Sequence, residues 1–515
     1  MCPLNSARRA LLGVSAALCL EAGAQAALAD DVFEPRELRV EGRPLLAFSL
    51  RIGEGGAGKD LAVLVVRGGP PDEIREVALL PTRPGAASMD RRSIEVAPDV
   101  VAVDVADVDP TPGDEILLVS AHSLRIVPTG AGGNPRTLRL DPPLALPPRA
   151  HDLSLLGTTR DWSGSGEPAI LLPTAEGVRL VGLRGGGATA FEIPPQADYE
   201  SFDPTTTARD AFFFAQLAWP SFSLGNDDGD DRDDLFALSR YGIAVFHGNL
   251  KGLPEQPSRA MRLRPFSVEE ELRPRATQLQ ILARDLDGDG LTDLVLHRSF
   301  GTLLRSEDRT EIYRNTGAGA DVLATPDARI APRAGVGILD AVDLDGDGRL
   351  EIVQARISFG VVQLLRLLTT RRAQVELRVD RVEGPGIAGL SRAWSDTISV
   401  GLDFEQGRLE GLFPTVDGDW NGDGRRDLLL GLSGSEIGIL LGGAGEAGPA
   451  FAGGTIRQQV PATGRALVSD LDGDGLDDLA VYDPRDGAGA VHWLRNRGVL
   501  PGSAPALRAT PGSGP

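Results

Sequence analysis

A ten-residue phrase rich in aspartate and glycine recurs along the chain and constrains its fold more than any other feature. Each clear copy has an acid or amide at its first, third, fifth and ninth positions, glycine at the fourth and sixth, and an apolar tenth residue. The clearest copies cover residues 285–294, 343–352, 419–428 and 470–479. A fifth copy, 226–235, keeps the polar positions but has Asp231 in place of the second glycine.

Degenerate copies extend the series toward the N-terminus. The copy at 107–115 has threonine and proline at its fifth and sixth positions, and the copy at 161–169 has two serines and no closing acid. We interpret both as surface turns. An eighth slot, ending at Asp60, keeps only the end of the phrase. Successive copies start about 60 residues apart on average, so the chain holds about eight units of a repeat architecture.

The phrase has the composition of a loop that holds a hard cation. Ca²⁺ binds about six to eight oxygen atoms, and carboxylates at alternate positions of a tight loop converge on one point. Glycine permits the positive φ that such a turn requires. Without a cation, several carboxylates within a few ångströms repel one another strongly. Four near-identical copies therefore predict Ca²⁺ loops, with four to five sites in all, although any single copy could be an acidic surface turn.

The residues around each loop predict strands rather than the helices of a helix–loop–helix site. Short apolar runs follow the ninth position, and a second run with a glycine near its start comes next. Examples of the first run are 61–66, 116–119 and 235–238; examples of the second are 241–245, 300–304, 359–362 and 437–441. Such a unit predicts a blade of about four antiparallel strands, and blades must pack in a ring to cover their faces. We predict an all-β β-propeller of eight blades, with seven blades plus an N-terminal β segment as the alternative.

The repeats resemble the FG-GAP/VCBS family, whose calcium-loop blades also build the head of integrin α-subunits. The resemblance covers residues 30–501 and implies cation ligands in each loop, the seventh residue contributing its carbonyl oxygen. The implied sets are Asp285, Asp287, Asp289, Leu291 and Asp293; Asp343, Asp345, Asp347, Arg349 and Glu351; Asp419, Asn421, Asp423, Arg425 and Asp427; and Asp470, Asp472, Asp474, Leu476 and Asp478. A fifth set is Asn226, Asp228, Asp230 and Asp234.

The two ends of the chain read as segments outside the propeller. Residues 1–29 have a basic start at Arg8 and Arg9, an apolar stretch too short to span a bilayer, and small residues suited to cleavage, so we predict a signal peptide. Both cysteines lie within it, so the mature chain would have no disulfide. Residues 502–515 read as a disordered tail. We expect an exported protein, periplasmic or secreted, without a transmembrane segment.

Two intervals, 192–215 and 366–410, are longer than a blade requires. Insertions in a ring of blades usually emerge on one face, where partners bind. The alternative is an elaborated loop or an extra hairpin that only caps the ring.

Charge and motif content narrow the range of functions that this chain could have. The net charge of −21 disfavours nucleic acid as a partner. We interpret the five histidines as structural, and we find no nucleophile elbow and no phosphate-binding loop. The sequence favours a non-catalytic, calcium-binding adhesion or interaction module for a protein or glycan, while leaving catalysis open. The alternatives are a polysaccharide lyase resembling the calcium-rich propellers that cleave rhamnogalacturonan, and a structural component of an envelope complex.

Overall fold

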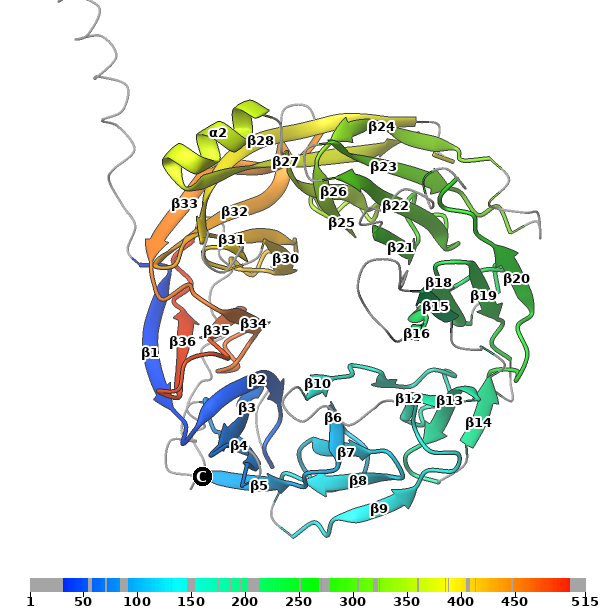
Figure 1. The fold of residues 1–515 in the computed structure, drawn as a ribbon, viewed down its shortest axis with the longest axis vertical. Helices are drawn as coiled ribbons and strands as arrows, with labels where there is room; N and C mark the ends of the chain where they lie inside the picture. Colours follow the sequence, from blue (N-terminus) through cyan, green and yellow to red (C-terminus); the bar gives the residue numbers. More distant parts are fainter. Residues whose placement is uncertain are drawn as a thin grey trace, which may run out of the picture.

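The computed structural model shows a closed ring of β-sheets arranged in chain order around a central axis (Figure 1). It describes residues 31–500 apart from short gaps. These gaps are 54–57, 70–71, 84–90, 131, 146–152, 175, 186–187, 192, 194–195, 202–212, 231, 250–251, 268–269, 271–277, 303–304, 318–322, 324, 359–360, 385, 388, 404–407, 413 and 446–447. The predicted signal peptide and C-terminal tail therefore lie outside the described residues.

Apart from one added parallel strand in blade 2, the first four blades are antiparallel sheets whose strands run outward from the ring centre in chain order. Blade 1 contains β2 (Arg43–Leu50), β3 (Asp60–Arg67), β4 (Ile74–Leu80) and β5 (Arg92–Val96). Blade 2 contains β6 (Val100–Ala106), β7 (Glu115–Ser120), β8 (Ser123–Pro128) and β9 (Arg136–Arg139), and β10 (Ser154–Leu155) joins β6 in parallel. Blade 3 contains β11 (Thr159–Arg160), β12 (Ala169–Thr174), β13 (Gly177–Gly182) and β14 (Ala188–Phe191). Blade 4 contains β17 (Ser221–Gly225), β18 (Asp234–Ser239), β19 (Gly242–Phe246) and β20 (Arg259–Arg262).

The remaining blades repeat this plan with longer outer strands. Blade 5 contains β21 (Gln278–Arg284), β22 (Asp293–Thr302), β23 (Arg305–Tyr313) and β24 (Ala328–Ala334). Blade 6 contains β25 (Val336–Val342), β26 (Glu351–Ile357), β27 (Arg372–Glu383), β28 (Gly389–Asp403) and β29 (Arg408–Leu409). Blade 7 contains β30 (Thr415–Gly418), β31 (Asp427–Ser433), β32 (Glu436–Gly445) and β33 (Gly448–Gln459). Blade 8 contains β34 (Arg465–Ser469), β35 (Asp478–Tyr482), β36 (Ala490–Asn496) and β1 (Phe33–Arg39).

The ring closes by pairing the two ends of the described chain. Strand β1 lies antiparallel against the outer side of β36, from Phe33 opposite Asn496 to Arg39 opposite Ala490 (Figure 1). The N-terminal segment is thus the outermost strand of the eighth blade. The prediction of eight blades is confirmed, and the seven-bladed alternative is wrong.

Apolar packing between blades follows from the period-two alternation of the strands. In β3, Ala62, Leu64 and Val66 pack toward blade 2, while Leu61 and Val63 pack toward blade 8. Among the described residues, eight buried apolar clusters each lie between two neighbouring blades, and together they continue around the ring. Each blade is therefore buried on both faces, as expected for a ring that has no free sheet faces.

Both of the predicted insertions contain β-strands. In the first, β15 (Gln196–Ser201) and β16 (Phe213–Ala218) pair as an antiparallel hairpin, and the segment between them lies outside the described residues. The second forms the long outer hairpin β27–β28 of blade 6. Both intervals therefore contain paired strands, and whether either insertion binds a partner or only caps the ring stays a prediction.

Two strand predictions need correction. Residues 300–302 are the end of β22 rather than the start of a new strand. Residues 361 and 362, predicted as a strand, begin helix α2 (Val361–Thr370), which lies on the outer rim (Figure 1). The apolar residues there recur at helical spacing, and Leu367 is buried while Leu365 and Leu368 are exposed. Among the described residues, no helix is long and apolar enough to cross a bilayer.

Candidate metal centres

The repeated phrase forms the connection between the innermost and second strands of a blade. In all eight blades the ninth position is the first residue of the second strand. These residues are Asp60, Glu115, Ala169, Asp234, Asp293, Glu351, Asp427 and Asp478. Because each connection leaves the same end of an inner strand, all of the loops lie on one face of the ring. We call this row of loops the loop belt.

Neighbouring members of the loop belt are joined by backbone hydrogen bonds across the blade boundaries. The N–H of Thr292 in blade 5 donates to the carbonyl of Asn226 in blade 4 at 2.7 Å. The N–H of Leu350 in blade 6 donates to the carbonyl of Leu286 in blade 5 at 3.1 Å. Lys59 of blade 1 makes the same contact to Asp470 of blade 8 at 3.0 Å. A cation in one loop would therefore stiffen a seam between blades as well as the loop itself.

The first aspartate of each clear loop folds the loop around its own carboxylate. In blade 5, Oδ1 of Asp285 accepts the N–H of Gly288 at 2.8 Å and Oδ2 accepts that of Gly290 at 2.9 Å. Both glycines have positive φ, 73° and 85°, so a side chain there would be strained. The same pair of contacts is made by Asp343, Asp419 and Asp470.

This turn brings the first, third and fifth acids together in three of the loops. We call these sets the acid triads: Asp285, Asp287 and Asp289; Asp343, Asp345 and Asp347; and Asp470, Asp472 and Asp474. Within each triad, one carboxylate oxygen from each residue lies within 4.8 Å of the others. The loop of blade 7 has an amide at its third position, where Asn421 donates to Asp423 at 3.0 Å.

A buried oxygen in blade 5 tests whether these residues fit a cation. The Asp287 side chain is 2% exposed, and its buried Oδ1 has no hydrogen-bond partner among the residues that the structure describes. A buried carboxylate oxygen normally has a donor or an ion beside it, so this atom fits a Ca²⁺ ligand. The seventh-position carbonyls of Leu291, Arg349, Arg425 and Leu476 remain predicted ligands.

The acid at the ninth position of each loop also anchors the loop to the blade, a role that the sequence did not indicate. In blade 5, Asp293 accepts the N–H of Leu286 at 3.1 Å through Oδ2 and the N–H of Asn315 at 2.8 Å through Oδ1. Corresponding contacts are made by Asp234, Asp427 and Asp478, and Glu351 makes the first of the two. These carboxylates remain predicted metal ligands and also hold the loop backbone in place.

Burial changes the acidity of the ninth residues. Burial, opposed in part by the hydrogen bonds and reinforced by the neighbouring acids, raises the pKa of Asp293, Glu351 and Asp427 to about 7. For the same reasons the pKa of Asp478 rises to about 8. Calcium favours the ionised form of a ligand, so binding would release protons from these groups near neutral pH.

Sequence reasoning missed a basic residue that faces several loops from the end of the third strand. Arg314 donates to Asp287 at 3.1 Å and to Asp289 at 2.8 Å. Arg495 contacts Asp472 in the same way in blade 8, and Arg381 lies 3.6 Å from Asp347 in blade 6. The signal was present as a repeated Arg-Asn-x-Gly at 314–317 and 495–498. These guanidinium groups offset the repulsion between the acids.

The two degenerate loops differ from the clear copies in different ways. Asp161 accepts the N–H groups of Ser163 and Ser165 at 3.2 and 3.1 Å and that of Gly166 at 2.6 Å. Arg51, which follows β2 of blade 1, donates to Asp107 and Asp114 of the blade 2 loop at 2.8 Å and so puts a guanidinium beside that loop. Both arrangements agree with the interpretation of these copies as structural turns.

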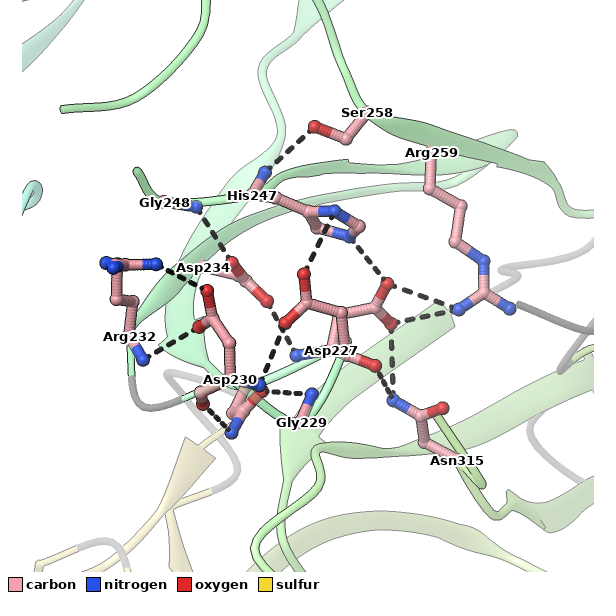
Figure 2. A network of polar contacts seen from close by, with 12 residues as sticks. Asp227, Gly229, Asp230, Arg232, Asp234, His247, Gly248, Ser258, Arg259 and Asn315 are labelled. Atoms are coloured by element: carbon pink, nitrogen blue, oxygen red, sulfur yellow. Dashed lines mark hydrogen bonds and ion pairs between the residues drawn. The ribbon is translucent and has the colours of Figure 1, made fainter. Parts of the chain in front are cut away.

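The loop of blade 4 gathers a different set of side chains. Asp228 and Asp234 each offer an oxygen within 4.8 Å of a ring nitrogen of His247. Figure 2 shows Asp234, His247 and their hydrogen-bond partners. The other two predicted ligands are engaged elsewhere. Asn226 donates to the carbonyl of Asp230 at 2.6 Å, and the Asp230 carboxylate pairs with Arg232 at 2.8 Å. His247, interpreted from sequence as structural, thus lies against the acids.

A cavity of about 560 Å³ lies among blades 4, 5 and 6, at the opposite ends of the strands from the loop belt. Its lining includes Trp219, Arg240, Gln278, His297 and Ser299. Both ring nitrogens of His297 are engaged, Nδ1 with the hydroxyl of Thr310 at 2.9 Å and Nε2 with the carbonyl of Gly337 at 3.3 Å. Burial lowers the pKa of His297. Ser299 is 3% exposed, and within the described part of the chain its Oγ has no hydrogen-bond partner.

Comparison with known proteins identifies the repeat. A family model of the FG-GAP-like repeat matches residues 281–353, which span blade 5 and the first loop of blade 6. No curated protein matches the sequence. Among solved structures, the Vibrio cholerae biofilm matrix protein Bap1 is similar at 14% identity over 92% of this chain and 90% of its own, with a TM-score of 0.28. The Saccharomyces cerevisiae core factor is similar at 9% identity over 80% and 61%, with a TM-score of 0.30. Scores this low support no conclusion about function.

Proposed function

Because the chain is an FG-GAP repeat β-propeller of eight blades, we propose that it is an exported, calcium-stabilised module that binds a protein or glycan ligand without catalysis. The observation that carries this proposal is that the loop belt and the cavity described above lie on opposite faces of the ring. The loop belt occupies one face, and the cavity among blades 4, 5 and 6 opens at the other strand ends. The proposed calcium sites and the proposed ligand site are therefore on opposite faces.

Calcium has a mechanical role in this proposal. Each occupied loop would fix the connection between two strands and, through the hydrogen bonds of the loop belt, the seam to the next blade. A mature chain without cysteines needs such clips in place of disulfides. The residues that would hold the ions are those of the acid triads, together with the predicted ligands of the blade 7 loop.

The cavity supports the binding half of the proposal. Its volume falls in the range of about 300–1,000 Å³ that is typical of small-ligand sites. Trp219 offers an apolar ring, while Gln278, Arg240 and Ser299 offer polar groups. A sugar unit or a protruding side chain of a partner protein fits this combination.

The lyase alternative is less well supported by the cavity. β-Elimination on a uronate needs a base and a cation beside the substrate carboxylate. Arg240 and His297 share the cavity, but both ring nitrogens of His297 are already hydrogen-bonded. The described lining residues include no carboxylate, and the acid triads lie at the opposite strand ends. This arrangement favours binding over elimination.

The test is a binding screen with variants of the cavity. The calcium-loaded chain would be applied to an array of neutral and uronate glycans and to labelled envelope proteins, and hits would be measured by calorimetry. Trp219→Ala should weaken binding at least tenfold. Ile74→Ala is the matched control, since Ile74 is 53% exposed on blade 1, far along the ring from the cavity. Equal binding by both variants, or an unsaturated product detected by ultraviolet absorbance, would contradict the proposal.

A further inference from the structure

The loop of blade 4 differs from those of blades 5, 6 and 8 at two positions that contact each other. Its second residue is Asp227, whereas the corresponding residue in blades 5 to 8 is a fully buried apolar side chain. Those apolar residues are Leu286, Leu344, Trp420 and Leu471. At the end of the third strand it has His247, where blades 5, 6 and 8 have arginine. On the fourth strand it has Arg259, which contacts Asp227 at 3.0 Å.

Histidine in place of arginine exchanges a side chain that cannot bind a metal ion for one that can. A guanidinium has no lone pair to offer, whereas a neutral imidazole has one. Nδ1 of His247 lies 3.4 Å from Oδ2 of Asp228, and Asp234 completes the group. Two ligand atoms that are each about 2.1 Å from one tetrahedral ion stand about 3.4 Å apart. The observed spacing between Nδ1 and the Asp228 oxygen matches this value.

The imidazole is held in the orientation that a metal ligand needs. Its Nε2 lies 3.0 Å from Oδ2 of Asp227. Asp227 is 5% exposed and is fixed in turn by Arg259 and by the amide of Asn315. An ionised Asp227 accepts a proton only from Nε2–H, which leaves the lone pair of Nδ1 directed toward Asp228. A carboxylate behind a histidine in this way is the usual outer partner of a metal-binding imidazole.

We propose that this loop binds a borderline divalent cation, with Zn²⁺ as the best fit, through Asp228, Asp234 and Nδ1 of His247. Calcium prefers an all-oxygen shell of about six to eight ligands, whereas zinc takes nitrogen and oxygen ligands in smaller number. Three protein ligands leave one position for water or for a group from a partner. The inference goes beyond the proposed function, because it holds whatever ligand the cavity takes and whether or not the acid triads bind calcium.

The test uses the full mature chain stripped of metal and then saturated with Ca²⁺. Titration with Zn²⁺, followed by calorimetry, should show one tight site, and Co²⁺ should give the visible absorption of a tetrahedral site with a nitrogen ligand. His247→Arg copies the residue found in blades 5, 6 and 8, so it should fold and should lower the Zn²⁺ affinity at least a hundredfold. Asp227→Asn should lower it about 10- to 100-fold by loosening the imidazole.

The control separates this site from the calcium loops. Asp287→Asn in blade 5 should leave the tight Zn²⁺ site unchanged. The inference is overturned if His247→Arg retains the tight site, or if excess Ca²⁺ displaces Zn²⁺ from it. If His247→Arg fails to fold, Asp228→Asn serves instead, and unchanged Zn²⁺ binding by that variant also overturns the inference. Loss of calcium binding alone would count against the proposed function and leave this inference standing.

Discussion

Replacing Phe33 with alanine should weaken the closure of the ring more than any other single change in β1. Phe33 is 0% exposed and packs edge-on against Trp420 of blade 7, with ring centroids 5.5 Å apart and planes at 83°. Its backbone is held separately, because the side chain of Gln458 accepts its N–H at 2.8 Å and donates to its carbonyl at 2.7 Å. The substitution therefore removes side-chain packing and leaves these hydrogen bonds intact.

The expected magnitude follows from the burial. Truncating a fully buried phenylalanine costs about 3–5 kcal/mol, which includes about 0.5–1.5 kcal/mol for the aromatic pair. Phe246→Ala is the matched control, since Phe246 is also 0% exposed and pairs with Phe191 at 5.0 Å, but lies away from the closure. Both variants should lose similar free energy of unfolding. Only Phe33→Ala should also free β1 locally.

Two assays separate these effects. Denaturant unfolding, followed by tryptophan fluorescence, gives the loss of free energy, and hydrogen exchange measured on peptides of β1 and β36 reports the closure. We expect exchange in both strands to accelerate in Phe33→Ala and to stay slow in Phe246→Ala. A loss below about 1 kcal/mol, with β36 still protected, would refute the assignment of β1 as the strand that closes the ring.

Three further predictions concern the loop belt. In metal-free protein, burial raises the pKa of Asp478 in the folded state from 3.8 to about 8. The protonated group therefore contributes stability that is complete below about pH 4 and is lost as the pH rises toward about 8. The melting temperature should fall between about pH 6 and 8.5, and a rise would contradict this sign. Asp478→Asn should cost about 1–3 kcal/mol in denaturant unfolding, because the amide cannot accept all three N–H groups that now point at its carboxylate, from Leu471, Trp493 and Asn496. Gly290→Ala, at φ 85° with open space around the new Cβ, should cost about 1–2 kcal/mol from backbone strain alone, and a neutral result would show that the loop backbone adapts.

The periodic part of the fold could be predicted from the sequence. The acid at the ninth position and the apolar run after it mark the start of the second strand in every blade where the acid is present, from Asp60 to Asp478. This works because the loop geometry is local, being made by contacts within one loop such as Asp285 with Gly288 and Gly290. The acid triads follow from the same local rule.

The features that sequence reasoning missed depend on contacts between distant segments. The pairing of Phe33 with Asn496 joins the two ends of the described chain and leaves no local pattern. Helix α2 was misassigned because a short apolar run is compatible with either a strand or a helix. The role of Arg314 could have been found from the repeated Arg-Asn-x-Gly. That of His247 required the structure, because its partners Asp227 and Asp228 lie in a loop 20 residues earlier, on the far side of a strand.

The ion content of the purified chain is the most direct test of whether calcium stabilises the ring. The mature protein would be stripped with a chelator, its metal content measured, and its melting curve recorded before and after a Ca²⁺ titration by calorimetry. We expect four Ca²⁺ ions in the loops of blades 5 to 8, with each site adding about 2.7 kcal/mol of stability at a free Ca²⁺ concentration 100 times its Kd. A melting curve that does not change after complete metal removal, with no Ca²⁺ bound on titration, would contradict the account.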